Sequence, residues 1–403
     1  MLKLAFRNVL RQKSHTVMTL AAIIGGVAGL ILSGGWVNDV FVQLSEALIH
    51  SQSGHLQVYK KGFFAEGSRT PEKYLIAAPD GIKQHIAVNP DVADVMARLN
   101  FSGLLNNGRS DLPIVGEGVE AGREARLGSS VSILAGRQLN DDDKFGAVLG
   151  HGVASGLKLK PGDHVTLLAN TLEGALNNID LEVIGVFQSF SNDYDARAIK
   201  IPLAAAQELL GTQDVNALVI SLKKTEDTNR IGAWLKEQPD ALSLEVKTWV
   251  ELNDFYEKTV EMYKGQFGVL QLIILIMILL SVANSVNMSI FERTGEFGTM
   301  MALGNRRRQV FRLIVIESVL LGIIGSSLGL AIGVVLALAI SAIGIPMPPP
   351  PNANLGYTAH IQIVPSGLLI SLIIGTFATV MAALLPASHI SRTPVVEALR
   401  QNF

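Results

Sequence analysis

Four long apolar segments dominate the pattern of hydrophobic and polar positions along the chain. They are residues 17–37, 266–290, 313–343 and 367–387. As a helix, each is long enough to cross a hydrocarbon core of ~30 Å, because a helix rises ~1.5 Å per residue and about 20 residues suffice. The third segment carries a single charged residue, Glu317, near its start. The pattern therefore predicts a membrane α-helical protein with four transmembrane helices.

A long polar region, residues 38–262, separates the first two apolar segments. Several stretches in it have alternating or continuous apolar and β-branched residues between glycine and aspartate turns, which predicts strands. These stretches are residues 112–119, 146–150, 163–170, 181–190, 216–222 and 244–250. Residues 201–211 and 225–238 have the spacing of amphipathic helices. The sequence therefore predicts a large α+β domain of two lobes, inserted between transmembrane helices 1 and 2.

The end of this region has helical periodicity over residues 251–264, and no proline or strong turn precedes Gly265. We therefore expect one helix to continue without a break from the inserted domain into the second transmembrane helix, as far as Ile290. Such a helix would connect the inserted domain mechanically to the polar insert that follows, residues 291–311.

Basic residues are distributed unevenly around the apolar segments. Residues 1–16 form a predicted amphipathic helix with four basic residues, five arginines lie in or beside the insert at residues 291–311, and residues 344–366 contain no lysine or arginine. Because basic residues are retained on the cytoplasmic side of a span, both termini and the insert are predicted to be cytoplasmic, the C-terminal tail being residues 388–403. The inserted domain and the 344–366 loop are then extracytoplasmic, as in a multi-pass protein of the cell inner membrane. A cleaved signal peptide is disfavoured because the first apolar run is too long.

Small residues recur every four positions in two of the predicted spans. They are Gly25, Gly29 and Ser33 in the first, and Gly325, Gly329 and Gly333 in the third. Such a spacing places small side chains on one face and allows helices to approach closely in lipid. The run at residues 325–329 also fits the G-x-S-x-G pattern of serine hydrolases, but that pattern needs a strand-to-helix turn. Helix packing is the favoured interpretation.

Composition and motifs argue against several other functions. The 403 residues include 49% hydrophobic residues and no cysteine, and the net charge of -2 gives no basic face for nucleic acid. The eight histidines form no zinc-binding spacing, and the three aspartates at residues 141–143 are predicted to be a solvated turn. No phosphate-binding G-x-x-x-x-G-K-[ST] loop is present in the sequence. We therefore expect a non-catalytic chain that itself binds no metal or cofactor.

The insert at residues 291–311 has the pattern of a short amphipathic helix. One side is apolar and consists of Phe297, Met300, Met301 and Leu303. Gly304 provides a C-terminal stop, and the arginines that follow suit the negative end of a helix dipole. Glu317 lies close enough to these arginines to pair locally. A basic loop that only fixes the topology is the alternative interpretation.

The order E-R-T-G-E-F-G-x-M-x-A-L-G-x-x-R-R-Q-V resembles the coupling segment of ABC transporter permeases of the MacB, LolC/LolE and FtsX type. The matching residues are Glu292, Glu296, Gly298, Ala302, Leu303, Gly304 and Arg307. The resemblance continues in weaker matches at residues 114–116, 148–150, 159–163 and 183–187, and in a closing pattern from Ala387 to Arg400. The G-H-L-Q-V run at residues 54–58 and the chain length look most similar to the LolC/LolE, lipoprotein-releasing type.

This resemblance implies a permease subunit that couples ATP hydrolysis by a separate cytoplasmic ABC ATPase, present in two copies and using Mg and ATP, to motion outside the membrane. It implies a second permease copy or a paralogue as partner, and an ATPase docked on the insert. We expect Phe297, Met300 and Met301 to be buried anchors in that contact and Glu296 to pair with a basic group of the ATPase. The implied substrate is a lipoprotein or another amphiphile. MacB-like efflux of a periplasmic substrate and FtsX-like regulation of a cell-wall hydrolase without transport are the alternatives.

Overall fold

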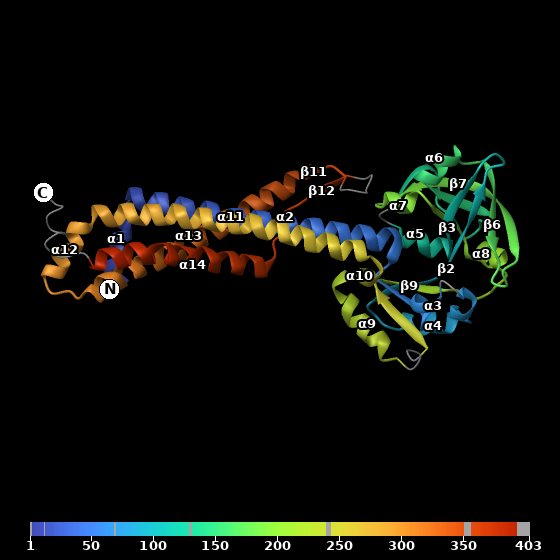
Figure 1. Cartoon of the computed structure of the whole chain (residues 1–403), viewed down its shortest axis with the longest axis horizontal. Coiled ribbons are helices and arrows are strands. Elements are labelled where there is room, and N and C mark those ends of the chain that lie inside the picture. The colour runs from blue at the N-terminus through green and yellow to red at the C-terminus, as the bar shows by residue number, and fades with distance from the viewer. Residues whose placement is uncertain are drawn as a thin grey trace. The chain divides into compact units, whose positions relative to one another are not determined.

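The computed structural model describes residues 2–11, 13–67, 70–128, 131–238, 243–349 and 356–392. The chain divides into two compact units (Figure 1). The helical unit comprises Met1–Phe41, Thr259–Pro346 and Thr358–Phe403. The sheet domain comprises Val42–Lys258 together with Met347–Tyr357. The closing pattern of the family resemblance, from residue 393 onward, and the proline run at residues 350–351 lie outside the described residues.

The helices of the helical unit correspond to the apolar segments. They are α1 (Leu2–Arg11), α2 (Lys13–Leu48), α11 (Asp254–Glu292), α12 (Thr294–Ala302), α13 (Arg307–Ile343) and α14 (Pro365–Arg392). A small two-stranded sheet, β11 (Ile345–Met347) and β12 (Tyr357–Ala359), follows α13. Among the described residues, four helices are long and apolar enough to cross a membrane: α2, α11, α13 and α14. This agrees with the four predicted spans. The expected continuous helix is present as α11, but it begins at Asp254 rather than Glu251, because Asn253 is non-helical and separates it from the short helix at residues 249–252.

The four long helices bury a common apolar core and expose apolar side chains around it. The core includes Ile23, Val27, Val282, Val310 and Ala383. Many large apolar side chains on the outside of α11, α13 and α14 are more than half exposed, which in water would form an oversized hydrophobic patch. Such a surface is the one expected of helices whose solvent is lipid.

Glycines allow α13 to approach α2 closely. A Cβ atom built on Gly329 would lie 2.9 Å from Cβ of Val27, and Gly325 and Gly333 are similarly close to Ile23 and Ile31. The glycines predicted to pack in the first span, Gly25 and Gly29, do not contact another described helix. Nothing in the described chain lies within 4 Å of a Cβ built on Gly25 or Gly29.

The close approach on α2 is instead made by glycines on other faces of the helix. Gly26 packs against Ile278 of α11, and Gly35 packs against Ile361 and Gln362. The hydroxyl of Ser33 donates only to the carbonyl of Leu30 on its own helix, at 3.2 Å. Because neighbouring positions on a helix point about 100° apart, a stripe one residue away faces a different direction.

One lobe of the sheet domain is a four-stranded antiparallel sheet with two helices. Its elements in chain order are β1 (Leu56–Lys60), α4 (Pro79–Ala87), β2 (Val92–Asn106), β9 (Ala217–Leu222), α9 (Thr228–Lys236) and β10 (Leu244–Thr248). In the sheet the strands lie in the order β10-β1-β9-β2. This β-α-β-β-α-β arrangement is the ferredoxin-like one, and its core contains Leu56, Ile86, Ile220 and Leu235.

The second lobe is inserted between β2 and β9. Its strands are β3 (Asp111–Val119), β4 (Ser132–Gly136), β5 (Gly146–Gly150), β6 (His164–Asn170), β7 (Leu176–Gln188) and β8 (Ala198–Pro202). The pairings run β2-β3-β8-β5-β7, and β6 pairs with both β7 and β2, so that these strands close a ring. The pairs β3 with β8 and β5 with β7 are parallel. Closure leaves the ring without free edges, and β4 extends it from β7.

Short helices and turns cover the two lobes. They are η1 (Ile49–Ser53), α3 (Phe63–Glu66), η2 (Pro71–Tyr74), α5 (Ala121–Leu127), α6 (His151–Leu157), α7 (Asn192–Asp195), α8 (Leu203–Leu210), η3 (Thr225–Asp227) and α10 (Trp249–Leu252). The predicted α+β domain of two lobes is therefore present. Several predicted boundaries were wrong: the helix of residues 201–211 begins only at Leu203, after β8, and the strand of residues 181–190 is the second part of β7, which begins at Leu176 and ends at Gln188. The strand of residues 244–250 ends at Thr248, whose hydroxyl caps α10.

Candidate functional site

The insert between α11 and α13 contains a short separate helix, α12, with a break in the backbone at each end. Arg293 follows α11 and is the N-cap of α12, with φ −101° and ψ 9°. Gly304 follows α12 with φ +100°, a conformation that favours glycine. Arg306 then caps α13, which begins at Arg307. Because both ends are non-helical, the orientation of α12 depends on its side-chain contacts.

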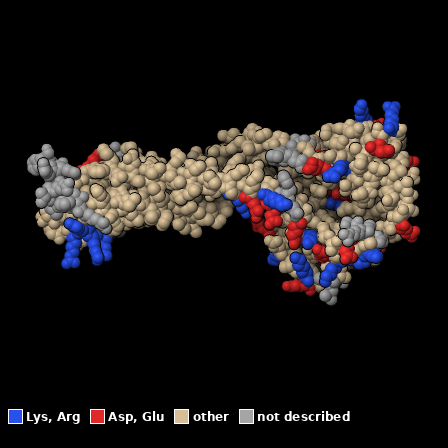
Figure 2. Space-filling view, in the orientation of Figure 1, with Lys and Arg blue, Asp and Glu red and all other residues tan. Residues whose placement is uncertain are grey.

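The arginines after Gly304 do not stand where the sequence suggested. We expected them at the negative end of a helix dipole, but Arg306, Arg307 and Arg308 lie at the start of α13, which is the positive end. All three are exposed, and basic side chains gather at the end of the helical unit near α12 (Figure 2). A helix start does not stabilise positive charge, so these arginines stay available for anionic groups outside the chain.

Phe297, which was predicted to anchor the ATPase, is buried within its own chain. Its side chain is 0% exposed and lies in the core of the helical unit, with the guanidinium of Arg293 4.9 Å from its ring centre. Met300 and Met301 are half-buried against the same core. The apolar side of α12 therefore packs first onto its own spans.

The surface of the insert that faces outward has different members. Leu303 is 82% exposed. The other exposed residues of the predicted coupling set are Glu292, Glu296, Gly304 and Arg307, whereas Gly298 is buried. This outward surface, rather than the buried aromatic ring, is what a partner can contact.

A buried ion pair connects the insert to α13. The guanidinium of Arg293 donates to both carboxylate oxygens of Glu317, at 2.7 and 3.2 Å, and the two residues are 6% and 8% exposed. The side-chain amide of Asn8, on α1, donates to Oε1 of Glu317 at 2.7 Å. Local pairing of Glu317 with an arginine was expected from the sequence. Its partner Arg293 is 24 positions away.

Glu296 was predicted to pair with a basic group of the ATPase, but in the structure it pairs within the chain. Its carboxylate accepts from Nε of Arg293 at 3.3 Å and from the guanidinium of Arg11 on α1. About half of its side chain is exposed, so the pair with Arg11 is a solvated one. Glu296 therefore belongs to the contacts that hold α12 on the spans.

A cavity of about 510 Å³ opens among α2, α11 and α14, at the end of the span bundle opposite to α12. Most of its walls are apolar, from side chains such as Leu30, Leu272 and Ile374. Amide side chains of Asn38, Gln271 and Gln362 also line it. It has the size and the mainly apolar lining of typical ligand pockets.

Hydrogen bonds hold the polar wall of this cavity in place. Nδ2 of Asn38 donates to Oε1 of Gln362 at 2.7 Å, and Nε2 of Gln362 donates to the carboxylate of Asp39 at 3.1 Å. The other oxygen of Asp39 accepts from the backbone N–H of His360 at 2.8 Å. The segment before α14 is thereby tied to α2.

Comparison with known proteins agrees with these features. Residues 16–238 match the family model of the MacB-like periplasmic core domain, and residues 268–395 match that of the FtsX-like permease C-terminal region. The chain belongs to the MacB/FtsX-like family of ABC transporter permeases. Because its helices also have the length and composition of membrane spans, this permease is a multi-pass membrane protein.

Individual relatives are distant in sequence. An uncharacterized ABC transporter permease of Methanocaldococcus jannaschii is 26% identical over 222 residues, which is 53% of each chain, so the permease spans about half the length of that relative. The lipoprotein-releasing system transmembrane protein LolE of Haemophilus influenzae is 21% identical over 80% of each chain. The uncharacterized ABC transporter permease YknZ of Bacillus subtilis is 23% identical over 99% of this chain and 98% of its own.

The sheet domain of the permease contains a buried cluster of four charges that the sequence did not indicate. Arg98 and Lys200 both contact the carboxylate of Glu124, at 2.8 and 2.6 Å, and Glu117 lies 3.9 and 3.8 Å from the same two cations. Burial opposes the charge of Glu124, but Arg98 and Lys200 hold its pKa below the usual value. The four residues come from three strands and α5, which is why no local pattern indicates them.

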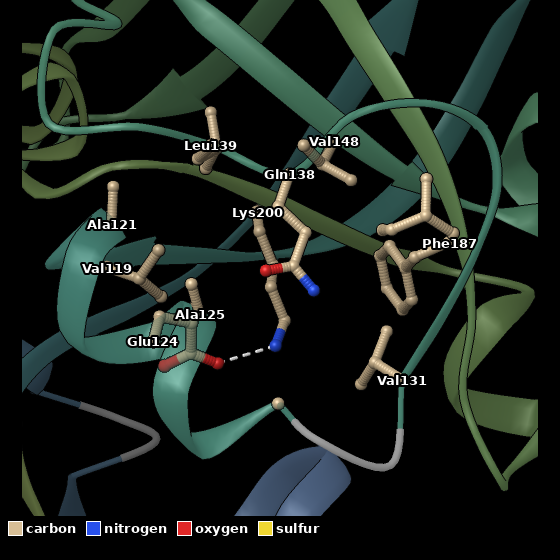
Figure 3. A pocket seen from close by; sticks show the side chains of 12 residues that line it. Val119, Ala121, Glu124, Ala125, Val131, Gln138, Leu139, Val148, Phe187 and Lys200 are labelled. Carbon is tan, nitrogen blue, oxygen red and sulfur yellow. Dashed lines mark hydrogen bonds and ion pairs between the residues drawn. The ribbon is translucent and has the colours of Figure 1, made fainter.

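A small cavity of about 40 Å³ borders this cluster. In Figure 3, Nζ of Lys200 and the carboxylate of Glu124 point toward one another, and apolar side chains such as Val131, Val148 and Phe187 surround them. The cavity has room for about one or two water molecules. We therefore assign the cluster a structural role in joining the two lobes.

The remaining sequence motifs have structural explanations in the permease. Asp143 pairs with Arg137 at 2.7 Å, and Asp141 accepts from the backbone N–H of Gly122 at 2.8 Å. Among the described residues, no group of three acidic or histidine side chains is arranged to hold a metal. The G-x-S-x-G run lies inside the continuous helix α13, so it lacks the strand-to-helix turn of a hydrolase.

Proposed function

We propose that the permease is the membrane subunit of a transporter that moves an amphiphile, such as a lipoprotein, out of the outer leaflet of the inner membrane. ATP is hydrolysed by a separate cytoplasmic ABC ATPase that contacts the insert. The termini and α12 face the cytoplasm, and the sheet domain lies outside. The observation that carries the proposal is the mainly apolar cavity among α2, α11 and α14, with its wall of amides.

This cavity suits an amphiphile better than a hydrophilic solute. Apolar walls hold an acyl chain by removing its surface from water, and amides bind its polar end through hydrogen bonds. Among the described residues of the spans, ionisable side chains facing this cavity are absent, whereas a hydrophilic route through a membrane normally has them. The cavity also favours transport over the FtsX-like hypothesis of a regulator, because a regulator needs no site for an amphiphile.

A pair of glycine variants on α11 tests the cavity. Gly268 lines it and Gly265 does not, and a Cβ at either position meets nothing within 4 Å. We expect Gly268→Leu to fill the cavity and to lower the amount of a triacylated lipoprotein retained by the purified transporter, while Gly265→Leu retains it normally. Equal retention by the two variants, measured by mass spectrometry, would refute the amphiphile assignment.

The ATPase contact is tested by Leu303, the most exposed apolar residue of the insert. Interface anchors commonly contribute more than ~2 kcal/mol, or about thirtyfold in affinity. We expect Leu303→Asp to release the ATPase during co-purification. Val88→Asp is the control, because Val88 in the sheet domain is equally exposed, at 81%. Release of the ATPase by both variants, or by neither, would place its contact elsewhere.

A further inference from the structure

The buried contacts of Arg293 combine three separate elements of the helical unit. Its two terminal nitrogens bind Glu317 of α13, its Nε binds Glu296 of α12, and its planar face lies over the ring of Phe297. Asn8 of α1 donates to the same carboxylate of Glu317. Every polar nitrogen of the guanidinium is thus directed to a partner, and the bidentate geometry fixes its orientation.

The Arg293–Glu317 ion pair lies where it can fix the orientation of α12. The backbone is non-helical at Arg293, at one end of α12, and at Gly304, at the other end. A short helix between two such breaks can pivot, and apolar packing alone resists rotation only weakly because it is not directional. The Arg293–Glu317 pair holds α12 in one orientation on α13.

Next to the pair lies a small cavity of about 40 Å³, whose walls are partly apolar and partly polar, the polar side chains including Asn8, Thr19 and Ser318. It is large enough for an ordered water. A purely apolar contact here would be simpler to bury, since a buried ion pair is costly to desolvate and is often replaceable by apolar residues without loss of stability. The directional pair is therefore explained better by orientation than by stability.

We propose that Arg293 and Glu317 are positioning residues that make α12 and α13 move as one body, so that force applied by the ATPase to the insert reaches the third span. This inference rests on the proposed function. It deepens that function by naming the residues that connect ATPase docking to motion of the spans.

Neutral variants separate this role from a contribution to folding alone. Arg293→Gln leaves the buried carboxylate of Glu317 without a cation among the described residues, and Glu317→Gln leaves Arg293 with only the half-exposed Glu296. The double variant R293Q/E317Q removes both buried charges and lacks that penalty. If the pair only avoided unpaired charge, the double variant would behave like the parent. If it fixes orientation, the double variant regains thermal stability and stays uncoupled.

The transporter is reconstituted in proteoliposomes with its ATPase and a purified triacylated lipoprotein. We expect the double variant to bind the ATPase and to hydrolyse ATP, with about a tenfold fall in lipoprotein released per ATP. Arg312→Gln is the control, because Arg312 lies on α13 and no ion pair of it is found among the described residues. A double variant with parental release per ATP would overturn the proposal.

A second readout is independent of transport. The chain has no cysteine, so spin labels can be placed at Thr299→Cys on α12 and Arg308→Cys on α13. The distance distribution between them should be narrow in the parent and broad in R293Q/E317Q. An unchanged distribution refutes the positioning role of Arg293 and Glu317, even if the ATPase binds. A broadened distribution supports that role. If the parent permease itself binds no ATPase, the broadened distribution still supports the role, and only the proposed docking is refuted.

Discussion

Replacing Glu124 by glutamine should strongly destabilise the sheet domain. Among the residues that the structure describes, Glu124 is the one carboxylate in direct contact with both buried cations, at 2.8 Å from Arg98 and 2.6 Å from Lys200. Glu117 is nearly 4 Å from each of them. Glu124→Gln keeps the shape of the side chain and leaves two buried cations facing one distant carboxylate.

The magnitude follows from the burial of all four charges. Removing one partner of a buried ion pair costs about 3–5 kcal/mol, because the other charge stays buried without compensation. For a domain of 150–250 residues each kcal/mol lowers the melting temperature by about 2–4 °C, so a loss of about 4 kcal/mol corresponds to about 8–16 °C. Lys200→Met should cost a similar amount. The double variant E124Q/K200M keeps Arg98 opposite Glu117, and its cost should be smaller than the sum of the single costs by about 2 kcal/mol.

Thermal unfolding of the full-length permease in detergent micelles measures these effects through tryptophan fluorescence. Trp234 and Trp249 lie in the sheet domain, and a Trp36→Phe background removes the remaining tryptophan, which lies in the helical unit. Glu173→Gln is the matched control, since Glu173 is an exposed carboxylate of the same domain and should change stability by less than about 0.5 kcal/mol. A melting temperature of E124Q within about 2 °C of the parent, or strictly additive costs in the double variant, would refute the reasoning.

Two further predictions concern helix packing and pH. Gly329→Leu should destabilise the helical unit by about 1–3 kcal/mol, because its Cβ would lie 2.9 Å from Val27. Gly29→Leu on α2 is the control, since its side chain meets open space and should be nearly neutral in the same unfolding assay. Equal effects of the two variants would contradict the observed packing of α13 on α2. Burial and the charge of His50 lower the pKa of His55 to about 4. Below pH ~6.5 the unfolded chain therefore takes up a proton at this histidine, whereas the folded chain does not. The free energy of unfolding should fall by about 3 kcal/mol between pH 6.5 and 4. His55→Gln should lose about 3 kcal/mol less than the parent over this pH range. An identical pH profile of variant and parent would contradict this prediction.

The sequence alone determined the membrane architecture of the permease. A chain crosses the membrane as a helix because the hydrocarbon core offers no hydrogen-bond partners, and such a helix needs about 20 consecutive apolar residues. A contiguous run of this length can be recognised in the sequence directly. The continuous helix α11 and most strands of the sheet domain are local in the same sense. Strand β2 was not predicted, and it shows where local patterns fail. It is shared between both lobes, with β9 pairing its first half and β3 its second. No single alternation therefore describes it.

The candidate site depended on the tertiary structure. The motif at the insert predicted a short amphipathic helix, which the structure has as α12, but its apolar residue Phe297 is buried in its own chain, because a short amphipathic helix covers the nearest apolar surface first. The partner of Arg293 is 24 residues away on another helix. Whether Gly25 or Gly26 faces a neighbour depends on a rotation of about 100°, which a four-residue spacing does not specify. Side-chain periodicity defines which faces a helix has, and only the packed structure decides what each face meets.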